Sequence, residues 1–172
     1  MHVRHHLARQ LNTSWSLLSL HLSTLGDDEA LWRPAEVGLH VHQDDGGAWT
    51  AEWPEREDYD LGPSNIAWLT WHIGFWWSMV LDHSFGEESL QRQHIGWPGS
   101  ASGAWQWLQA LHDNWVQSVE TLSDADFDST ARTRWPMRER PFADVAAWVN
   151  VELMKNAAEI GYVRFLYAVR PR

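Results

Sequence analysis

The sequence predicts an all-α fold, a four-helix bundle, on three observations. Apolar residues recur at alternating steps of three and four in four segments, which we predict as helices over residues 2–25, 64–85, 101–122 and 142–169. A period-two pattern between the first two segments predicts a small β-hairpin. The 172 residues are 44% hydrophobic and contain no long polar tract, so we expect a single domain over residues 1–172.

The hairpin is expected in the long connection that follows the first helix. Residues 39–43 and 48–53 alternate polar and apolar positions around an Asp-Asp-Gly-Gly segment, which is typical of a hairpin turn. His40 and His42 would share one face of the first strand. There we expect a surface ladder with Glu52 rather than a metal site.

The second helix, over residues 64–85, should be the most deeply buried of the four. Pro63 precedes it, Ser64 is the expected N-cap and Gly86 the expected stop. Tryptophan and other apolar residues cover nearly every face, which is typical of a buried helix. His72 lies inside this apolar surface, and a buried imidazole needs a hydrogen bond, a charge or a metal at each nitrogen. We therefore look for a partner of His72 on another helix.

The third helix carries a second inward-facing histidine, His112. It lies in the middle of an apolar stripe that begins at Trp105 and ends at Leu122 with steps of three and four. Two interpretations of His112 stay open. It is a core histidine that a buried acceptor satisfies, or it is a ligand or an acid–base group.

Two polar residues, Glu152 and Asn156, interrupt the apolar stripe of the fourth helix, and Glu159 lies at the edge of that stripe. Side chains four apart on a helix point the same way, about 6 Å from each other. If the second and fourth helices are neighbours, His72 meets the Glu152–Asn156 pair at one point. The three residues then form either a metal centre or a buried hydrogen-bonded network.

Composition excludes several classes of function. The chain has no cysteine, so it has neither a disulfide nor a protein thiolate as ligand or nucleophile. The formal charge of -10 disfavours nucleic acid and anionic membranes as partners. We expect a cytoplasmic protein without a signal peptide or a membrane span. Small molecules or other proteins remain as partners, and Lys155 and Arg164 are expected to be surface cations on the outer face of the fourth helix.

Three segments carry a family resemblance: Trp32-Arg33-Pro34, residues 65–72 and residues 151–161. They resemble the DinB/YfiT-like superfamily, and the similarity covers essentially the whole chain. The resemblance implies an up-down-down-up four-helix bundle that is often dimeric, so we expect a homodimer. It also implies a divalent metal bound by a histidine of the second helix and a His-x-x-x-His pair of the fourth. Several relatives are thiol-dependent S-transferases or isomerases that use bacillithiol, mycothiol or glutathione.

Carried onto this chain, the resemblance assigns the metal to His72, Glu152 and Asn156, with Glu152 and Asn156 standing where the family has histidines. A carboxylate binds zinc, nickel or manganese readily, whereas a neutral amide suits harder ions. A metal with open positions would lower the pKa of a bound low-molecular-weight thiol, and Glu159 or His112 would accept a proton. The implied function is a metal-dependent thiol S-transferase or related hydrolase acting on a small-molecule substrate. The alternative is a non-catalytic bundle with a tryptophan-lined binding pocket or a purely structural polar network.

Overall fold

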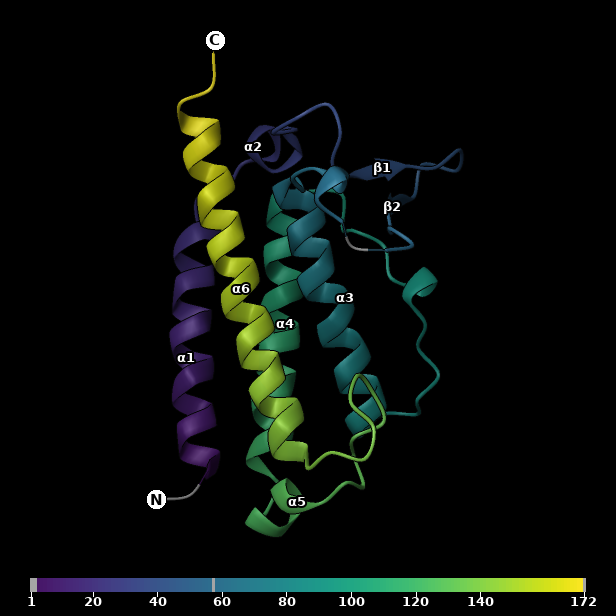
Figure 1. Cartoon of the computed structure of the whole chain (residues 1–172), viewed down its shortest axis with the longest axis vertical. Coiled ribbons are helices and arrows are strands. Elements are labelled where there is room, and N and C mark those ends of the chain that lie inside the picture. The colour runs from purple at the N-terminus through teal and green to yellow at the C-terminus, as the bar shows by residue number, and fades with distance from the viewer. Residues whose placement is uncertain (1–2, 57, 172) are drawn as a thin grey trace.

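Four long helices lie side by side in the part of the chain that the computed structural model describes, residues 3–56 and 58–171 (Figure 1). They are α1 (Val3–Leu22), α3 (Ile66–Phe85), α4 (Ala101–Glu120) and α6 (Phe142–Ala168). α1 and α6 run in one direction along the long axis, and α3 and α4 run in the other (Figure 1). The mostly helical architecture expected from the sequence is confirmed, and each long helix ends within a few residues of its predicted bounds.

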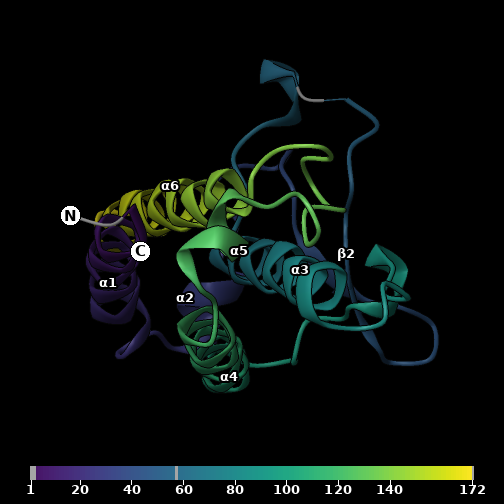
Figure 2. The ribbon, with the colours of Figure 1, turned by 90° about the horizontal axis from the view of Figure 1, so that it is seen from below.

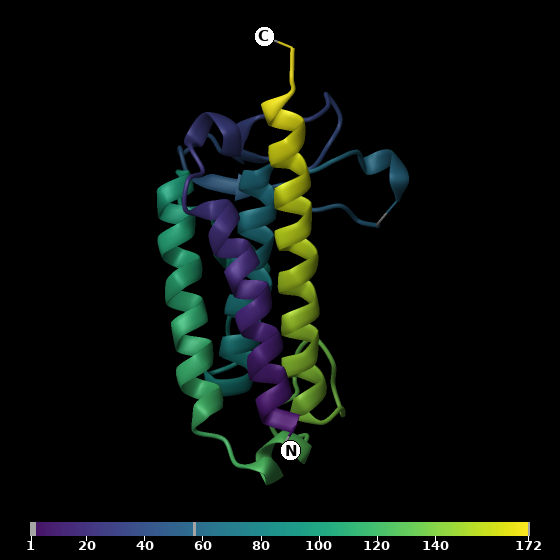
Figure 3. The same cartoon turned by 90° about the vertical axis from the view of Figure 1, so that its left-hand side faces the viewer.

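The neighbours in this arrangement decide where a site can form. α6 packs against α1 and α3, and α3 packs against α4. Seen from below, α1, α6, α3 and α4 follow one another around the bundle (Figure 2), and α1 lies beside α6 in the third view (Figure 3). The second and fourth predicted helices are therefore adjacent, as the convergence of His72 with the fourth helix requires.

Helix α3 is capped one residue later than the sequence suggested. Asn65, rather than Ser64, is the N-cap, and its Oδ1 accepts a hydrogen bond of 2.8 Å from the Trp68 backbone N–H. Gly86 ends the helix as predicted. Ser100 caps α4, and its hydroxyl accepts a hydrogen bond of 3.0 Å from the Gly103 N–H.

The predicted hairpin forms, with shorter strands than expected. β1 (Val41–Gln43) pairs antiparallel with β2 (Trp49–Ala51). The turn between them is closed by a 2.9 Å hydrogen bond from the Gly47 N–H to the Asp44 carbonyl, and Gly47 has the positive φ of 81° that glycine adopts without strain. The Asp-Asp-Gly-Gly signal in the sequence thus identified the turn correctly.

His40 is buried, so the expected surface position is wrong for this residue. It precedes β1 and is only 2% exposed. Its backbone N–H donates to the Glu52 carboxylate at 2.9 Å, and the neighbouring Leu39 carbonyl accepts from the Asn65 N–H at the start of α3. These bonds hold the base of the hairpin against the bundle, and the bundle covers the His40 side chain. His42 does lie at the surface, next to Thr50.

Short elements occupy the connections. The first contains α2 (Asp27–Leu31) and the 3-10 helix η1 (Tyr59–Leu61), the second contains η2 (Arg92–His94), and the third contains α5 (Asp124–Asp128). The expectation that Arg164 is a surface cation is wrong. Its guanidinium donates to the Glu29 carboxylate at 2.8 Å, and both side chains are less than one quarter exposed. This ion pair fixes α2 to α6.

The core is centred on α3, as its apolar surface predicts. Trp71, Trp76 and Trp77 are at most 2% exposed. Gly74 lets α4 approach, because a Cβ at this position would overlap the Trp107 ring. None of the helices in residues 3–56 and 58–171 combines the length and the apolarity of a membrane span.

Candidate functional site

A pocket of about 650 Å³ opens between α3, α6 and the loop that follows the hairpin. α3 contributes Trp68, Leu69 and His72 to its wall. α6 contributes a polar side made of Lys155, Asn156, Glu159 and Tyr162. The loop adds Trp53, Glu55 and Arg56, so the rim carries both signs of charge. Its size and its mixture of aromatic walls with a few polar groups are typical of a small-molecule site.

His72 is held in this pocket by aromatic stacking. Its imidazole lies parallel to the Trp68 indole, with ring centroids 5.0 Å apart and an interplanar angle of 9°. The Nδ1 atom is enclosed and has no hydrogen-bond partner among the described residues. A buried nitrogen without a partner is costly, and in native sites it often marks a ligand-binding group.

His72 is uncharged at neutral pH. Burial lowers its pKa from 6.5 to about 4, because a charged imidazole loses its hydration inside the protein. The positive charge of Lys155 lowers the pKa further, and a hydrogen bond with the Asn156 side chain acts in the opposite direction. The imidazole is therefore available at pH 7 as a hydrogen-bonding group or a metal ligand without competition from a proton.

Asn156 connects the core to the pocket. It is 1% exposed, and its Oδ1 accepts a hydrogen bond of 3.2 Å from the Trp76 indole N–H. Its Nδ2 donates a bond of 2.8 Å to the Glu159 carboxylate. These two bonds fix the orientation of the amide, and the amide in turn holds Glu159 at the pocket wall.

Glu152 is turned to a different partner. Its carboxylate forms an ion pair of 2.7 Å with Lys155 Nζ, one turn along α6, and it is not among the described residues that line the pocket. The structure thus brings His72 and Asn156 together, as the sequence predicted, and adds Glu159 and Lys155 to them. The assignment of Glu152 as a metal ligand stays a prediction.

His112 occupies another part of the bundle. Its ring stacks on Trp15 of α1 at 4.1 Å and meets the edge of Trp77 at 6.1 Å. Its Nδ1 lies 3.0 Å from the Asp113 carboxylate, while its Nε2 is enclosed without a hydrogen-bond partner among the described residues. It does not belong to the described lining of the His72 pocket. A catalytic role for His112 at that pocket is accordingly a prediction without a contact to support it.

As placed, the side chains do not fit a divalent metal. Within residues 3–56 and 58–171, no group of three or more His, Cys, Asp or Glu side chains could hold such an ion. The Asn156 oxygen already accepts from Trp76, and the Glu152 carboxylate is held in an ion pair by Lys155. The Lys155 ammonium would also repel a cation beside His72, since its charge already disfavours imidazolium there.

Sequence reasoning missed the pocket residues that the loop contributes, such as Trp53, because a loop position carries no periodic signal. It also assigned Lys155 to the outer face, although this residue reaches the pocket. A signal for the α6 residues did exist. Lys155 follows Glu152 by three and Glu159 follows Asn156 by three, which is the spacing of side-chain pairs along a helix.

Comparison with known proteins identifies the family. The family model described as the DinB superfamily matches residues 10–160, from the first half of α1 to the second half of α6. The searches of curated proteins and of solved structures found no match. The matched segment covers well over half of the chain and includes His72, Asn156 and Glu159. The chain belongs to the DinB superfamily.

Proposed function

We propose that the His72 pocket is the functional site of an up-down-down-up DinB-type bundle and that it binds a low-molecular-weight thiol for transfer to a small-molecule electrophile. One observation carries the proposal: His72 of α3 and Asn156, Glu159 and Lys155 of α6 line the same pocket of about 650 Å³, together with the aromatic rings of Trp53 and Trp68. The aromatic walls suit an apolar acceptor, and the charged groups suit a polar thiol carrier. We also propose that the protein is cytoplasmic and forms a homodimer.

Lys155 is the group that would activate the thiol. Its positive charge acts on the interior of the pocket, where, after burial, it is the second cause that lowers the pKa of His72. A cation beside a thiol stabilises the thiolate, which is the reactive nucleophile. The thiolate sulfur forms a bond to the electrophilic carbon of the acceptor, and the leaving group departs with its bonding electron pair. Glu159 takes the thiol proton and passes it to water.

His72 and Asn156 would position the reactants. The neutral imidazole accepts or donates a hydrogen bond without adding positive charge, because its pKa is about 4. Asn156 holds the Glu159 carboxylate at 2.8 Å, so this base does not need to be ordered when the thiol binds. A pocket that orients both reactants makes the transfer effectively intramolecular.

The second candidate is the metal-dependent version of this reaction, which the unpartnered Nδ1 of His72 favours. When bound, a divalent metal would supply a Lewis acid that lowers the pKa of the thiol. His72 would hold it together with Asn156 and Glu152. Because the described side chains do not fit the ion in their present arrangement, no step is assigned to it.

The test is an S-transfer assay with glutathione, mycothiol and bacillithiol and with 1-chloro-2,4-dinitrobenzene as acceptor. Attack on the ring carbon forms the C–S bond and releases chloride, so that the product is followed by its absorbance. We expect a rate above the uncatalysed background with at least one thiol, in the presence of a chelator. No binding and no turnover with any of the three thiols would overturn the proposal.

Two variants separate the two candidates. Lys155→Met removes the activating charge, so the rate should fall and the pH at which it reaches half of its maximum should rise. Glu152→Gln removes the ion-pair partner of Lys155 but keeps the ammonium, so the metal-free reaction should continue. If activity instead disappears in Glu152→Gln and in the chelator, and returns with zinc, nickel or manganese, the metal-dependent candidate is correct.

A further inference from the structure

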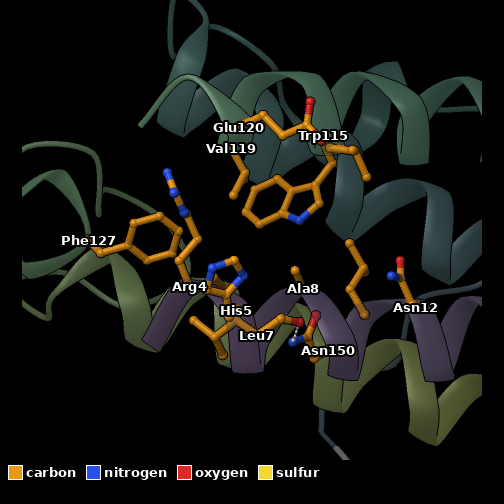
Figure 4. Close-up of a pocket in the computed structure, with 13 residues that line it drawn as sticks. Arg4, His5, Leu7, Ala8, Asn12, Trp115, Val119, Glu120, Phe127 and Asn150 are labelled. Carbon is orange, nitrogen blue, oxygen red and sulfur yellow. Dashed lines mark hydrogen bonds between the residues drawn. The ribbon is translucent and has the colours of Figure 1, made fainter. Parts of the chain in front are cut away.

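A second pocket, of about 480 Å³, lies between α1 and α4, and Phe127 of α5 and Ala146 and Asn150 of α6 complete its lining (Figure 4). We call it the α1–α4 pocket. Among the described residues, none that lines it also lines the His72 pocket. The reaction proposed above therefore uses none of its residues, and a role for this pocket has to be argued separately.

The pocket lies where α1 has a small residue, Ala8, in place of the large ring that it has two turns further along. Further along the same helices, Trp15 of α1 stacks on His112 at 4.1 Å and on Trp105 at 5.1 Å, and these rings fill the space between α1 and α4. Ala8 is seven residues before Trp15, two turns away on the same face of α1. Both Ala8 and Trp115 line the pocket, and the methyl group of Ala8 leaves open the space that a ring at this position would fill.

The wall of the pocket is largely apolar and includes an aromatic surface. Trp115 is 2% exposed and Phe127 is 1% exposed, and both line the cavity. Figure 4 shows the Trp115 indole projecting from α4 toward Ala8 on α1, with Phe127 at one end. A flat ring inserted between Ala8 and Trp115 would lie against an indole on one side and a helix surface on the other.

One hydrogen-bond donor in this wall is unused. The Trp115 indole N–H makes no hydrogen bond with any described residue; its side chain is almost completely buried, but the nitrogen faces the open space of the pocket (Figure 4). Buried indole N–H groups usually have a partner. Two other polar groups of the lining already have partners: Arg4 donates to the Leu122 carbonyl at 3.0 Å, and Asn150 donates to the Leu7 carbonyl at 2.8 Å. An oxygen acceptor on a ligand would satisfy the Trp115 donor.

The charges at the rim indicate that this ligand is uncharged. Arg4 and Glu120 both line the pocket and carry opposite charges. An ion entering between them would gain attraction from one and repulsion from the other. An uncharged molecule loses less hydration on entering an apolar pocket than an ion does.

We propose that the α1–α4 pocket is a second small-molecule site that takes an uncharged aromatic compound of one or two rings carrying a carbonyl or hydroxyl oxygen. The rings lie between Ala8 and Trp115, and the oxygen accepts a hydrogen bond from the Trp115 indole N–H. A pocket of about 480 Å³ falls in the size range of ligand sites.

The experiment uses the full chain and two probes: 6-propionyl-2-dimethylaminonaphthalene, an uncharged naphthyl ketone, and naphthalene, which has no acceptor. Fluorescence titration gives the affinity for the ketone, which should bind with saturation and with a blue shift. In nitrogen-15-labelled protein, the indole N–H signal of Trp115, identified as the one missing in Trp115→Phe, should move on addition of the ketone. A stationary Trp115 signal at saturation would overturn the proposal.

The site is tested by filling it. Ala8→Leu should weaken ketone binding by about tenfold or more, because the leucine side chain occupies the space of the rings. The matched control is Ala158→Leu, the same change at an exposed position of α6, which should leave the affinity unchanged. Unaltered affinity in a folded Ala8→Leu protein would place the ketone elsewhere and overturn the proposal.

Trp115→Phe provides a second test if Ala8→Leu does not fold. This change keeps an aromatic wall and removes the N–H donor. It should weaken binding of the ketone by a larger factor than binding of naphthalene, which competes with the ketone in the same titration. Equal losses for the two probes would show that the N–H recognises no acceptor, and that part of the proposal would be wrong.

Discussion

Asn156 donates a 2.8 Å hydrogen bond to Glu159 while its carbonyl oxygen accepts from the Trp76 indole at 3.2 Å. One buried amide thus connects a core tryptophan of α3 to a carboxylate at the pocket wall. Both hydrogen-bonding sides of the amide are used, which fixes its orientation. The DinB resemblance implies a histidine ligand at position 156. Here Asn156 occupies that position and orders Glu159 instead.

We expect Asn156→Leu to destabilise the protein by about 1–3 kcal/mol, because the Trp76 indole N–H is left buried without an acceptor. Chemical unfolding with urea measures the loss. The matched control is Asn150→Leu, another buried asparagine of α6, which donates to the Leu7 carbonyl away from the His72 pocket. Both variants should lose stability, but only Asn156→Leu should reduce thiol binding. Equal effects on thiol binding would contradict the role of Asn156 in ordering Glu159.

Stability should depend on pH through His72. Its pKa is about 4 in the folded protein and 6.5 when exposed, so between these values the unfolded chain binds the additional proton. The stability contributed by the neutral imidazole is therefore present above pH 6.5 and is lost as the pH falls toward 4, by up to about 3 kcal/mol. His72→Phe cannot titrate, and its free energy of unfolding should fall less over this range. If the free energy of unfolding of the unaltered protein and of His72→Phe fell equally with pH, this pH dependence would not come from His72.

Metal binding should appear when the two histidines of the family are restored. We expect protein purified without an affinity tag to contain no stoichiometric zinc, because the present donors do not fit the ion. The double variant Glu152→His, Asn156→His provides two imidazoles one turn apart opposite His72, and should bind zinc tightly. Elemental analysis and a competition titration with a chelator measure this. Stoichiometric zinc in the unaltered protein would contradict the expectation.

The outer face of α6 should mediate self-association. Val151, Tyr162 and Phe165 of α6, together with Val169 directly after the helix, are between 64% and 80% exposed, and Tyr162 also borders the His72 pocket. They recur on one face of a helix, at spacings of 11, 3 and 4 residues. Exposed apolar stripes of this kind mark interaction surfaces, and we expect a homodimer through this face.

Sedimentation velocity tests the dimer. The double variant Tyr162→Glu, Phe165→Glu introduces like charges into both halves of a symmetric contact, so it should sediment as a monomer. Leu20→Glu is the control, because Leu20 is 68% exposed on α1. A monomeric parent protein, or a double variant that remains dimeric, would exclude this interface.

The sequence alone predicted the four long helices to within a few residues, the hairpin in the first connection, and the inward faces of His72 and Asn156. These features follow from local signals: the period of apolar residues, the Asp-Asp-Gly-Gly turn and the stop at Gly86. Such signals are read along one segment, and a helix repeats them at every turn. They therefore predicted elements and buried faces well.

Only the tertiary structure decided that Glu159 and Lys155, rather than Glu152, reach the pocket with His72. Positions three and four apart share one helix face, so the sequence cannot choose between carboxylates on adjacent turns. That choice depends on the rotation of α6 relative to α3. The α1–α4 pocket likewise has Ala8 of α1 opposite Trp115 of α4, and which side chains oppose each other is fixed by the packing of whole helices.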